Sequence, residues 1–407
     1  MSSSSFASAA KLFGHRPFLF YFFARGFSEL SRQIAAVAVG WQVYALTGSA
    51  FDLGIVGLLE FIPTALLIFI AGHVADRYDR KRIMQICQLG VGIAGALLAW
   101  GSVAGWLNVE EIFLAVAFLG AATAFESPAA VSLLPAVTPE GMLQRGTALF
   151  TGAFQVAMIG GPAVGGLVYA LSPGAPYALL AVFALLASVL NGAIRLDRPV
   201  IARDAPTFGS LFAGVGFVRR TPAILGAISL DLFTVLLGGV TALMPIYARD
   251  ILHTGPWGLG VLRAAPAVGA LVMATVLARG AIDRRVGMRM LQAIMVFGAA
   301  TVVFALSHVL WLSILALMVL GAADTVSMVI RISLVQLSTP EEMRGRVSAV
   351  NFLFVNSSYQ LGEFESGITA ALLGAMPAAV LGGVATIAVA LLWMKLFPAL
   401  RTMERLE

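Results

Sequence analysis

A charged run, GHVADRYDRKR at residues 72–82, ends one long apolar segment of the chain and precedes the next. Its pattern returns in the second half of the sequence, where Asp283 and Arg284 stand 207 residues after Asp76 and Arg77. A short basic turn between apolar segments, repeated at a fixed distance, is typical of a membrane protein whose two halves share one architecture.

The composition extends this interpretation to the whole chain. Of the 407 residues, 59% are hydrophobic and 12% are charged. Soluble domains carry about 25% charged residues, so the surplus apolar side chains must face lipid. A spanning helix needs roughly 20 apolar residues, and twelve such helices leave no room for a separate soluble domain. We expect these helices at residues 18–46, 52–75, 83–107, 111–136, 146–171, 175–195, 222–248, 257–279, 288–307, 310–336, 346–371 and 376–397.

Further matches between the two halves keep the same order along the chain. The tripeptide Thr-Pro-Glu at 138–140 returns at 339–341, and Gly161 and Gly166 return as Gly362 and Gly367, all at an offset of 201 residues. Parallel repeats of this kind are typical of two-lobed secondary transporters, in which the substrate binds between the lobes. We therefore predict an all-α membrane protein with an N-terminal six-helix lobe at 1–195, a cytoplasmic linker with an amphipathic stretch at 196–221, and a C-terminal six-helix lobe at 222–407.

The basic residues indicate how the chain is oriented. The net charge is +5, and most of the 26 Lys and Arg residues fall in loops that are cytoplasmic if the N-terminus is cytoplasmic. This is the bias that the positive-inside rule describes, and the opposite orientation inverts it. We predict a protein integral to the cytoplasmic (inner) membrane with both termini in the cytoplasm. The positive charge then reflects topology, and we expect no nucleic-acid partner.

The run at 72–82 resembles the G-x-x-x-D-R-x-x-R-R/K loop of the major facilitator superfamily, with Asp79 where the family usually has glycine. The resemblance implies two six-helix lobes, and it implies that the acid in this loop helps to latch the lobes in the outward-facing state. The alternative is that the loop only anchors the topology. The gating-loop candidates are Gly72, Asp76, Arg77, Arg80, Asp283 and Arg284.

A second motif lies in the predicted helix at 146–171. Gly161-Pro162 and Gly165-Gly166 resemble the G-P-x-x-G-G motif of drug-type exporters in the superfamily. Proline removes one backbone donor and bends a helix, and small residues let helices pack closely in lipid. We predict a helix pivot at these four residues, with ordinary small-residue packing as the alternative.

Four acidic residues lie deep inside apolar segments, one in the first helix of each group of three. They are Glu29, Glu126, Asp231 and Asp324. An ionised group in hydrocarbon is costly, so each must face protein or water. The resemblance implies that these helices line the cavity, and we predict the four acids as proton-coupling residues. Any one of them could instead be a satisfied structural acid.

Two further acids, Glu363 and Glu365, are proton-coupling candidates in the predicted helix at 346–371. Glu363 takes the place of Pro162 in the repeat. Burial favours the neutral form of a carboxyl group. Glu363 could therefore carry a proton, or it could pair with Arg263 on a neighbouring helix.

Three arginines inside predicted helices, Arg25, Arg32 and Arg331, are candidates for the substrate cavity. Spacings of four and three residues put Arg25, Glu29 and Arg32 on one helix face, and a spacing of seven does the same for Asp324 and Arg331. The first set is either a neutralised structural cluster or a site for an anionic or polar substrate. In the second case we expect Arg32 near the substrate and Arg25 nearer the cytoplasmic gate.

The remaining features narrow the function. The chain has no phosphate-loop motif, so ATP is not the energy source, and we expect a proton gradient and no cofactor. Cys87 is the only cysteine and the four histidines are scattered, so we expect no metal site and no enzyme. Residues 41–49, 253–260 and 362–367 resemble the branch of the superfamily with enterobactin and macrolide exporters.

We predict a monomeric, proton-coupled exporter of a small molecule, of siderophore or drug-like type, with membrane lipid around it. The first alternative is uptake or facilitated transport of a nutrient on the same fold. The second is transport of a divalent metal, because clustered carboxylates bind such cations. A third is a receptor or scaffold that transports nothing.

Overall fold

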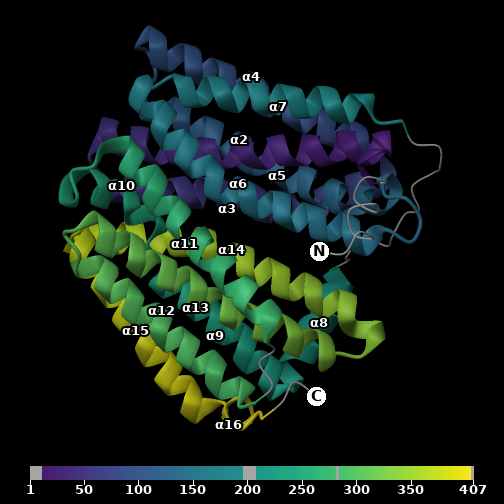
Figure 1. Ribbon diagram of the computed structural model, residues 1–407, viewed down its shortest axis with the longest axis vertical. Coiled ribbons are helices and arrows are strands. Elements are labelled where there is room, and N and C mark those ends of the chain that lie inside the picture. Colours follow the sequence, from purple (N-terminus) through teal and green to yellow (C-terminus); the bar gives the residue numbers. More distant parts are fainter. Residues whose placement is uncertain (1–11, 196–207, 281–283, 405–407) are drawn as a thin grey trace. The chain divides into compact units, whose positions relative to one another are not determined.

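Every regular element in the computed structural model is helical over the residues that it describes, which are 12–195, 208–280 and 284–404 (Figure 1). The elements of the first half are α2 (Arg16–Thr47), α3 (Ala50–Arg77), α4 (Arg80–Ala104), α5 (Val109–Val137), α6 (Leu143–Leu171) and α7 (Ala175–Ala193). Those of the second half are α8 (Phe208–Arg220), α9 (Pro222–Gly238), η1 (Thr241–Leu243), α10 (Met244–Ile246), η2 (Tyr247–Ile251), α11 (Gly255–Arg279), α12 (Val286–Leu306), α13 (Leu310–Leu337), α14 (Glu341–Leu373), α15 (Ala375–Leu396) and α16 (Pro398–Arg401).

The predicted pattern of twelve spanning helices is confirmed. Within the described residues, ten helical segments are long and apolar enough to cross a membrane, and the stretch from Pro222 to Ile251 counts as one of them. The other two are α2 and α14, with 32 and 33 residues. These two helices carry more charge, since α2 contains Arg25, Glu29 and Arg32, and α14 contains four charged residues in its first two turns and two more at Glu363 and Glu365.

The chain forms two compact units, which are described separately. Unit 1 consists of Met1–Gln42 and Ile62–Ala205, and unit 2 consists of Val43–Phe61 and Pro206–Glu407. Helices α2 and α3 therefore each contribute to both units. The predicted linker at 196–221 lies partly outside the described residues, since residues 196–207 are not among them.

Local sequence signals explain where several helices begin and end. The side chain of Asp79 caps the start of α4 by accepting a hydrogen bond from the Lys81 amide, at 3.0 Å. Asn108 and Glu111 form a capping box at the start of α5. Gly105 ends α4 in the left-handed conformation, at φ 78°, which glycine adopts without a steric penalty.

Glycines bring the helices of unit 1 close together. Helices α4 and α7 run side by side (Figure 1), and a side chain at Gly92 or Gly95 of α4 would collide with α7. At Gly95, an added Cβ would lie 2.7 Å from Leu180 and 3.0 Å from the backbone of Ala181. Close backbone approach of this kind is how helices associate in lipid, where burial of apolar surface supplies no driving force.

In unit 2, the seventh spanning segment departs from the continuous helix that we predicted at 222–248. Helix α9 ends at Gly238, and Gly239 has an extended backbone before the chain resumes as η1, α10 and the π-helical η2. Adjacent glycines weaken the helix there. The Ser366 hydroxyl on α14 donates to the freed Gly239 carbonyl at 2.7 Å, which meets the need to satisfy backbone groups inside a membrane.

The segment Val43–Phe61 packs on the rest of unit 2 through its own glycines. An added Cβ at Gly54 of α3 would lie 3.0 Å from the Phe364 carbonyl oxygen and 3.1 Å from Gly367 of α14. At the turn before α3, the Tyr44 hydroxyl donates to the Asp250 carboxylate, and Arg249 Nη1 donates to the Tyr44 carbonyl at 3.0 Å. The predicted glycine repeat at 367 thus serves close helix packing.

The amphipathic stretch that we predicted in the linker forms α8 over its described part and packs within unit 2. A Cβ at Gly214 would lie 2.9 Å from the Arg346 carbonyl oxygen of α14. Val218 joins a buried apolar cluster with Ile224 and Val347.

Candidate functional site

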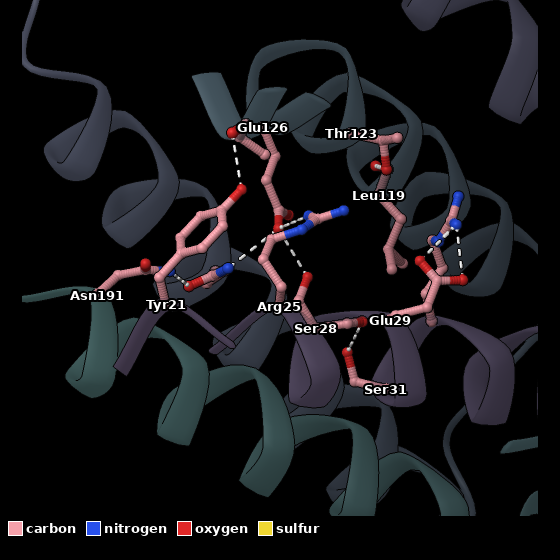
Figure 2. Close-up of polar contacts among 12 residues, drawn as sticks. Tyr21, Arg25, Ser28, Glu29, Ser31, Leu119, Thr123, Glu126 and Asn191 are labelled. Carbon is pink, nitrogen blue, oxygen red and sulfur yellow. Dashed lines mark hydrogen bonds and ion pairs between the residues drawn. The ribbon is translucent and has the colours of Figure 1, made fainter. Parts of the chain in front are cut away.

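The first cluster of buried charges lies in unit 1, between α2 and α5 (Figure 2). Arg25 Nη1 contacts Glu126 Oε1 at 2.8 Å, so two of the predicted site residues form an ion pair across the helices. The Ser28 hydroxyl donates to the same carboxylate oxygen at 2.7 Å. Nearby, the Tyr21 hydroxyl donates to the Ala130 carbonyl at 2.7 Å, which ties α2 to α5 one turn away.

Two amide side chains support Glu126 from the other side. Gln88 Nε2 on α4 donates to Glu126 Oε1 at 3.0 Å, and Asn191 Nδ2 on α7 donates to Gln88 Oε1 at 2.7 Å. Gln88 is 1% exposed and Asn191 is fully buried. Four helices of unit 1 therefore contribute to one polar network around a single carboxylate.

The second cluster in unit 1 is built on α2 alone. Arg32 Nη2 contacts both Glu29 carboxylate oxygens, at 2.8 and 2.7 Å, and Gln33 Nε2 donates to Glu29 Oε1 at 2.8 Å. Gln33 also approaches the Met158 sulfur of α6 at 3.0 Å. Glu29 is 5% exposed, whereas the Arg32 side chain is 41% exposed. Arg25 and Arg32 thus lie on one helix but pair with different acids.

The buried charges of unit 2 pair between α9 and α13. Arg331 Nη1 contacts Asp231 Oδ2 at 2.5 Å, and the two side chains are 5% and 3% exposed. The neighbouring residues Leu230, Ile330 and Leu334 belong to a large apolar cluster. The second predicted acid of this group, Asp324, lies near Arg331 and accepts a hydrogen bond from the Tyr359 hydroxyl of α14 at 3.4 Å.

The two interhelical pairs occupy corresponding places in the repeat with the charges exchanged. Asp231 lies 206 residues after Arg25, and Arg331 lies 205 residues after Glu126. In unit 1, the first helix of the unit provides the cation and the fourth provides the anion. In unit 2, α9 provides the anion and α13, which corresponds to α5 in the repeat, provides the cation.

The acids of α14 have partners other than Asp231 and Arg331. Glu363 and Glu60 both interact electrostatically with Arg263 of α11, so the structure places Glu363 beside the arginine that we considered as its partner. Glu365 accepts a hydrogen bond from the Thr369 hydroxyl at 2.8 Å, one turn along the same helix.

The gating-loop residues are only partly described. The side chain of Asp76 and the whole of Asp283 lie outside the described residues. Arg80 is 5% exposed, and its Nε donates to the Ala75 carbonyl at 3.1 Å, which holds the turn between α3 and α4. Arg77 and Arg284 are exposed, and Gly72 is half-buried. Whether these residues gate transport stays a prediction.

The glycine-proline motif of α6 lies against α2. Gly161, Pro162, Gly165 and Gly166 are all buried. An added Cβ at Gly165 would lie 3.2 Å from the Ile34 backbone, and one at Gly161 would collide with Gln33. The motif therefore brings α6 close to the part of α2 that holds Glu29, and its role as a pivot stays a prediction.

Sequence reasoning missed the uncharged members of the unit 1 network, which are Ser28, Gln88 and Asn191. The predicted site was defined by ionisable groups in apolar segments, and amide side chains were not part of it. The signal was nevertheless available, because an unpaired amide is also costly in hydrocarbon. A single Asn at position 191 of an otherwise apolar helix was the strongest such signal.

This fold and these buried pairs are those of a membrane transporter, and the chain belongs to the Major Facilitator Superfamily, whose family model matches residues 21–363. Curated relatives include the enterobactin exporter EntS of Citrobacter koseri, which is 28% identical over 95% of this chain and 93% of its own length. The protein of the same name from Shigella boydii serotype 18 is 29% identical over 83% of this chain and 81% of its own.

Solved structures show the same fold at low sequence identity. A bacterial homologue of the human lysosomal transporter Spinster matches with a TM-score of 0.74 at 13% identity, over 96% of this chain and 99% of that one. A bacterial homologue of the iron transporter ferroportin matches with a TM-score of 0.70 at 18% identity, over 95% and 99% of the two chains. These relatives are transporters, and the chain is not an enzyme.

Proposed function

We propose that this chain is a proton-driven exporter in the cytoplasmic membrane, with both termini in the cytoplasm, and that it moves a siderophore or drug-like small molecule by alternating access. The observation that best supports the proposal is the Arg25–Glu126 pair, which lies at mid-helix and is held by groups from four helices. Buried ionisable groups inside membrane segments are usually retained for function. Export of a siderophore is further favoured by relatives that are named enterobactin exporters.

In this proposal the arginines bind the substrate and the acids carry protons. Arg25 and Arg32 are partly exposed, and each contacts an acid that is more buried than itself. A guanidinium group presents several donors in a fixed plane and suits an anionic or polyhydroxylated substrate. When an acid gains a proton, its hold on the arginine weakens, and the arginine becomes available to the substrate.

Flux measurements in proteoliposomes test proton coupling. We expect the purified protein to move enterobactin faster with an imposed pH gradient than without one. Glu126→Gln and Asp231→Asn should each abolish the part of the enterobactin flux that depends on the pH gradient. Glu110→Gln is the matched control, because Glu110 is exposed at the start of α5. Flux that ignores the gradient, or normal coupling in both variants, would show that these acids are structural.

Transport direction is tested with inside-out membrane vesicles. An exporter accumulates the substrate in such vesicles, and an uptake protein does not. Running the assay with enterobactin and with a macrolide separates the two substrate types. If accumulation occurs only in right-side-out vesicles, the uptake alternative replaces export.

A further inference from the structure

The carboxylate of Glu126 is better supplied with donors than its pairing with Arg25 requires. Its Oε1 atom receives hydrogen bonds from Arg25 at 2.8 Å, from Ser28 at 2.7 Å and from Gln88 at 3.0 Å. A single arginine already neutralises the charge. The additional donors mean that Glu126 keeps two hydrogen bonds if Arg25 moves away.

The Gln88 support is itself held in place. The amide of Gln88 donates from Nε2 to Glu126 at 3.0 Å, and its Oε1 accepts from Asn191 Nδ2 at 2.7 Å. An amide group carries its donor and acceptor at opposite ends, so fixing one end fixes the other. Asn191 reaches Gln88 because Gly92 and Gly95 let α7 approach α4.

This arrangement has a cost that packing alone does not explain. Burying an amide in apolar surroundings is unfavourable unless its groups are paired. Asn191 is fully buried, and its Oδ1 atom has no hydrogen-bond partner among the described residues. In unit 2, the helices that repeat α4 and α7 place Met295 and Trp393 at the apolar cluster beside the corresponding ion pair. Two amides in unit 1 therefore replace side chains that could have been apolar.

We propose that Gln88 and Asn191 are positioning residues that hold the Glu126 carboxylate in place when Arg25 leaves it for an anionic group of the substrate. This inference rests on the proposed function in assigning Arg25 to the substrate. Asn191 orients Gln88, and Gln88 supplies the donor. The carboxylate then stays where Arg25 can return to it at the end of the transport cycle.

A substrate-free experiment tests the support directly, using thermal unfolding of the purified full-length protein in detergent. Arg25→Met and Gln88→Met should each lower the melting temperature modestly, because Glu126 keeps two donors in either variant. The double variant should lower the melting temperature by clearly more than the sum of the two single effects, because Ser28 is then the one remaining donor of the three to Glu126. Independent sites add, whereas groups that share a partner do not.

The matched control is Gln42→Met, the same substitution at a buried glutamine of unit 1 that donates to Ser102 and not to Glu126. Its effect should add to that of Arg25→Met. If the double variant with Gln88→Met does not fold, adding Glu126→Gln should restore folding, because the unsupported charge is gone. The proposal would be overturned if the effects of Gln88→Met and Arg25→Met on the melting temperature were simply additive. It would also be overturned if Glu126→Gln did not restore folding to a double variant that fails to fold.

Asn191→Leu tests the orienting role. It should lower the melting temperature of the wild type, because Gln88 loses its anchor. In the Gln88→Met background it should be neutral or stabilising, since Asn191 then has nothing to orient. The same loss in both backgrounds would mean that Asn191 acts only through packing.

The transport arm uses enterobactin as the probe. In Gln88→Met, Glu126 depends more strongly on Arg25, so drawing Arg25 to the substrate costs more. We expect the KM to rise about tenfold, the equivalent of one hydrogen bond to a charged group, with little change in maximal flux. A tenfold fall in maximal flux with an unchanged KM would contradict the proposal. If the wild type does not carry enterobactin, the proposed substrate is wrong, and the unfolding experiments still decide the role of the amides.

Discussion

The two interhelical ion pairs join corresponding helices of the two units, but they are constructed differently. In unit 1, Arg25 and Glu126 are 26% and 11% exposed, and Glu126 also accepts from a hydroxyl and an amide. In unit 2, Asp231 and Arg331 are 3% and 5% exposed. Within the described residues, Arg331 provides the one side-chain hydrogen bond to Asp231, and Arg331 Nε has no partner.

This difference indicates which pair can exchange partners. A buried pair with no substitute donors is expensive to open, because each charge is left in an apolar environment. A partly exposed pair with spare donors can open at low cost. We infer that the unit 1 pair can release its arginine during transport, and that the unit 2 pair stays closed unless Asp231 gains a proton.

The largest expected effect separates the two pairs by stability. Arg331→Met leaves the buried Asp231 without its partner, so that it must stay unpaired or take up a proton, and it should lower the free energy of unfolding by about 3–5 kcal/mol. Arg25→Met leaves Glu126 with two donors at a partly solvated site, and it should cost about 1–2 kcal/mol. Thermal unfolding in detergent at one scan rate measures both. Equal losses would remove the distinction between the pairs.

Replacing both partners sharpens the comparison. Asp231→Leu with Arg331→Met is made in an Asp324→Asn background, because Asp324 lies near Arg331 and would otherwise lose its neighbouring cation. The double variant should return unit 2 to within about 1 kcal/mol of the stability of Asp324→Asn alone. Arg25→Met with Glu126→Leu removes the acceptor of Ser28 and Gln88. It should stay about 2–3 kcal/mol below the wild type, because unpaired buried donors remain. Recovery of both double variants to the same degree would show that the amides do not depend on Glu126.

The sequence predicted the fold well because membrane helices depend on a simple pattern. Length and hydropathy placed twelve helices, and the repeat related the two halves. The pattern failed where helix geometry depends on tertiary partners. Gly238 and Gly239 read as small residues in a long apolar segment, and the break between them is stabilised by Ser366, which is more than a hundred positions away in the chain.

The sequence also identified the charged residues but not their pairing. Helix periodicity placed Arg25, Glu29 and Arg32 on one face, and it could not show that Arg25 reaches across to Glu126 while Arg32 bonds Glu29. Partners on different helices depend on packing distances, which helix periodicity does not give. The charge exchange between Arg25–Glu126 and Asp231–Arg331 was visible in the repeat offsets only once the pairs were known.

The comparison extends to the helices that hold Arg25 and Asp231. Helix α2 is continuous, whereas the spanning segment that begins with α9 breaks after Gly238. Ser366→Ala removes the donor to the Gly239 carbonyl and should cost about 1–3 kcal/mol, the penalty of an unpaired buried acceptor. Ser358→Ala is the control on the same helix, since that hydroxyl only donates to a carbonyl one turn back. Equal effects of the two variants in thermal unfolding would mean that the break does not need its cap.

The smallest expected effect tests redundancy in unit 1. Ser28→Ala removes one of three donors to Glu126 and should cost less than about 1 kcal/mol, because a charge-assisted bond to Arg25 and the Gln88 bond remain. Ser31→Ala on the same helix is the control, since its hydroxyl donates to the Ser28 carbonyl and not to the carboxylate. In the Arg25→Met background, Ser28→Ala should lower the stability by more than it does in the wild type, whereas the loss caused by Ser31→Ala should stay the same. A Ser28 effect that is large in the wild type, or the same in both backgrounds, would show that the three donors do not substitute for one another.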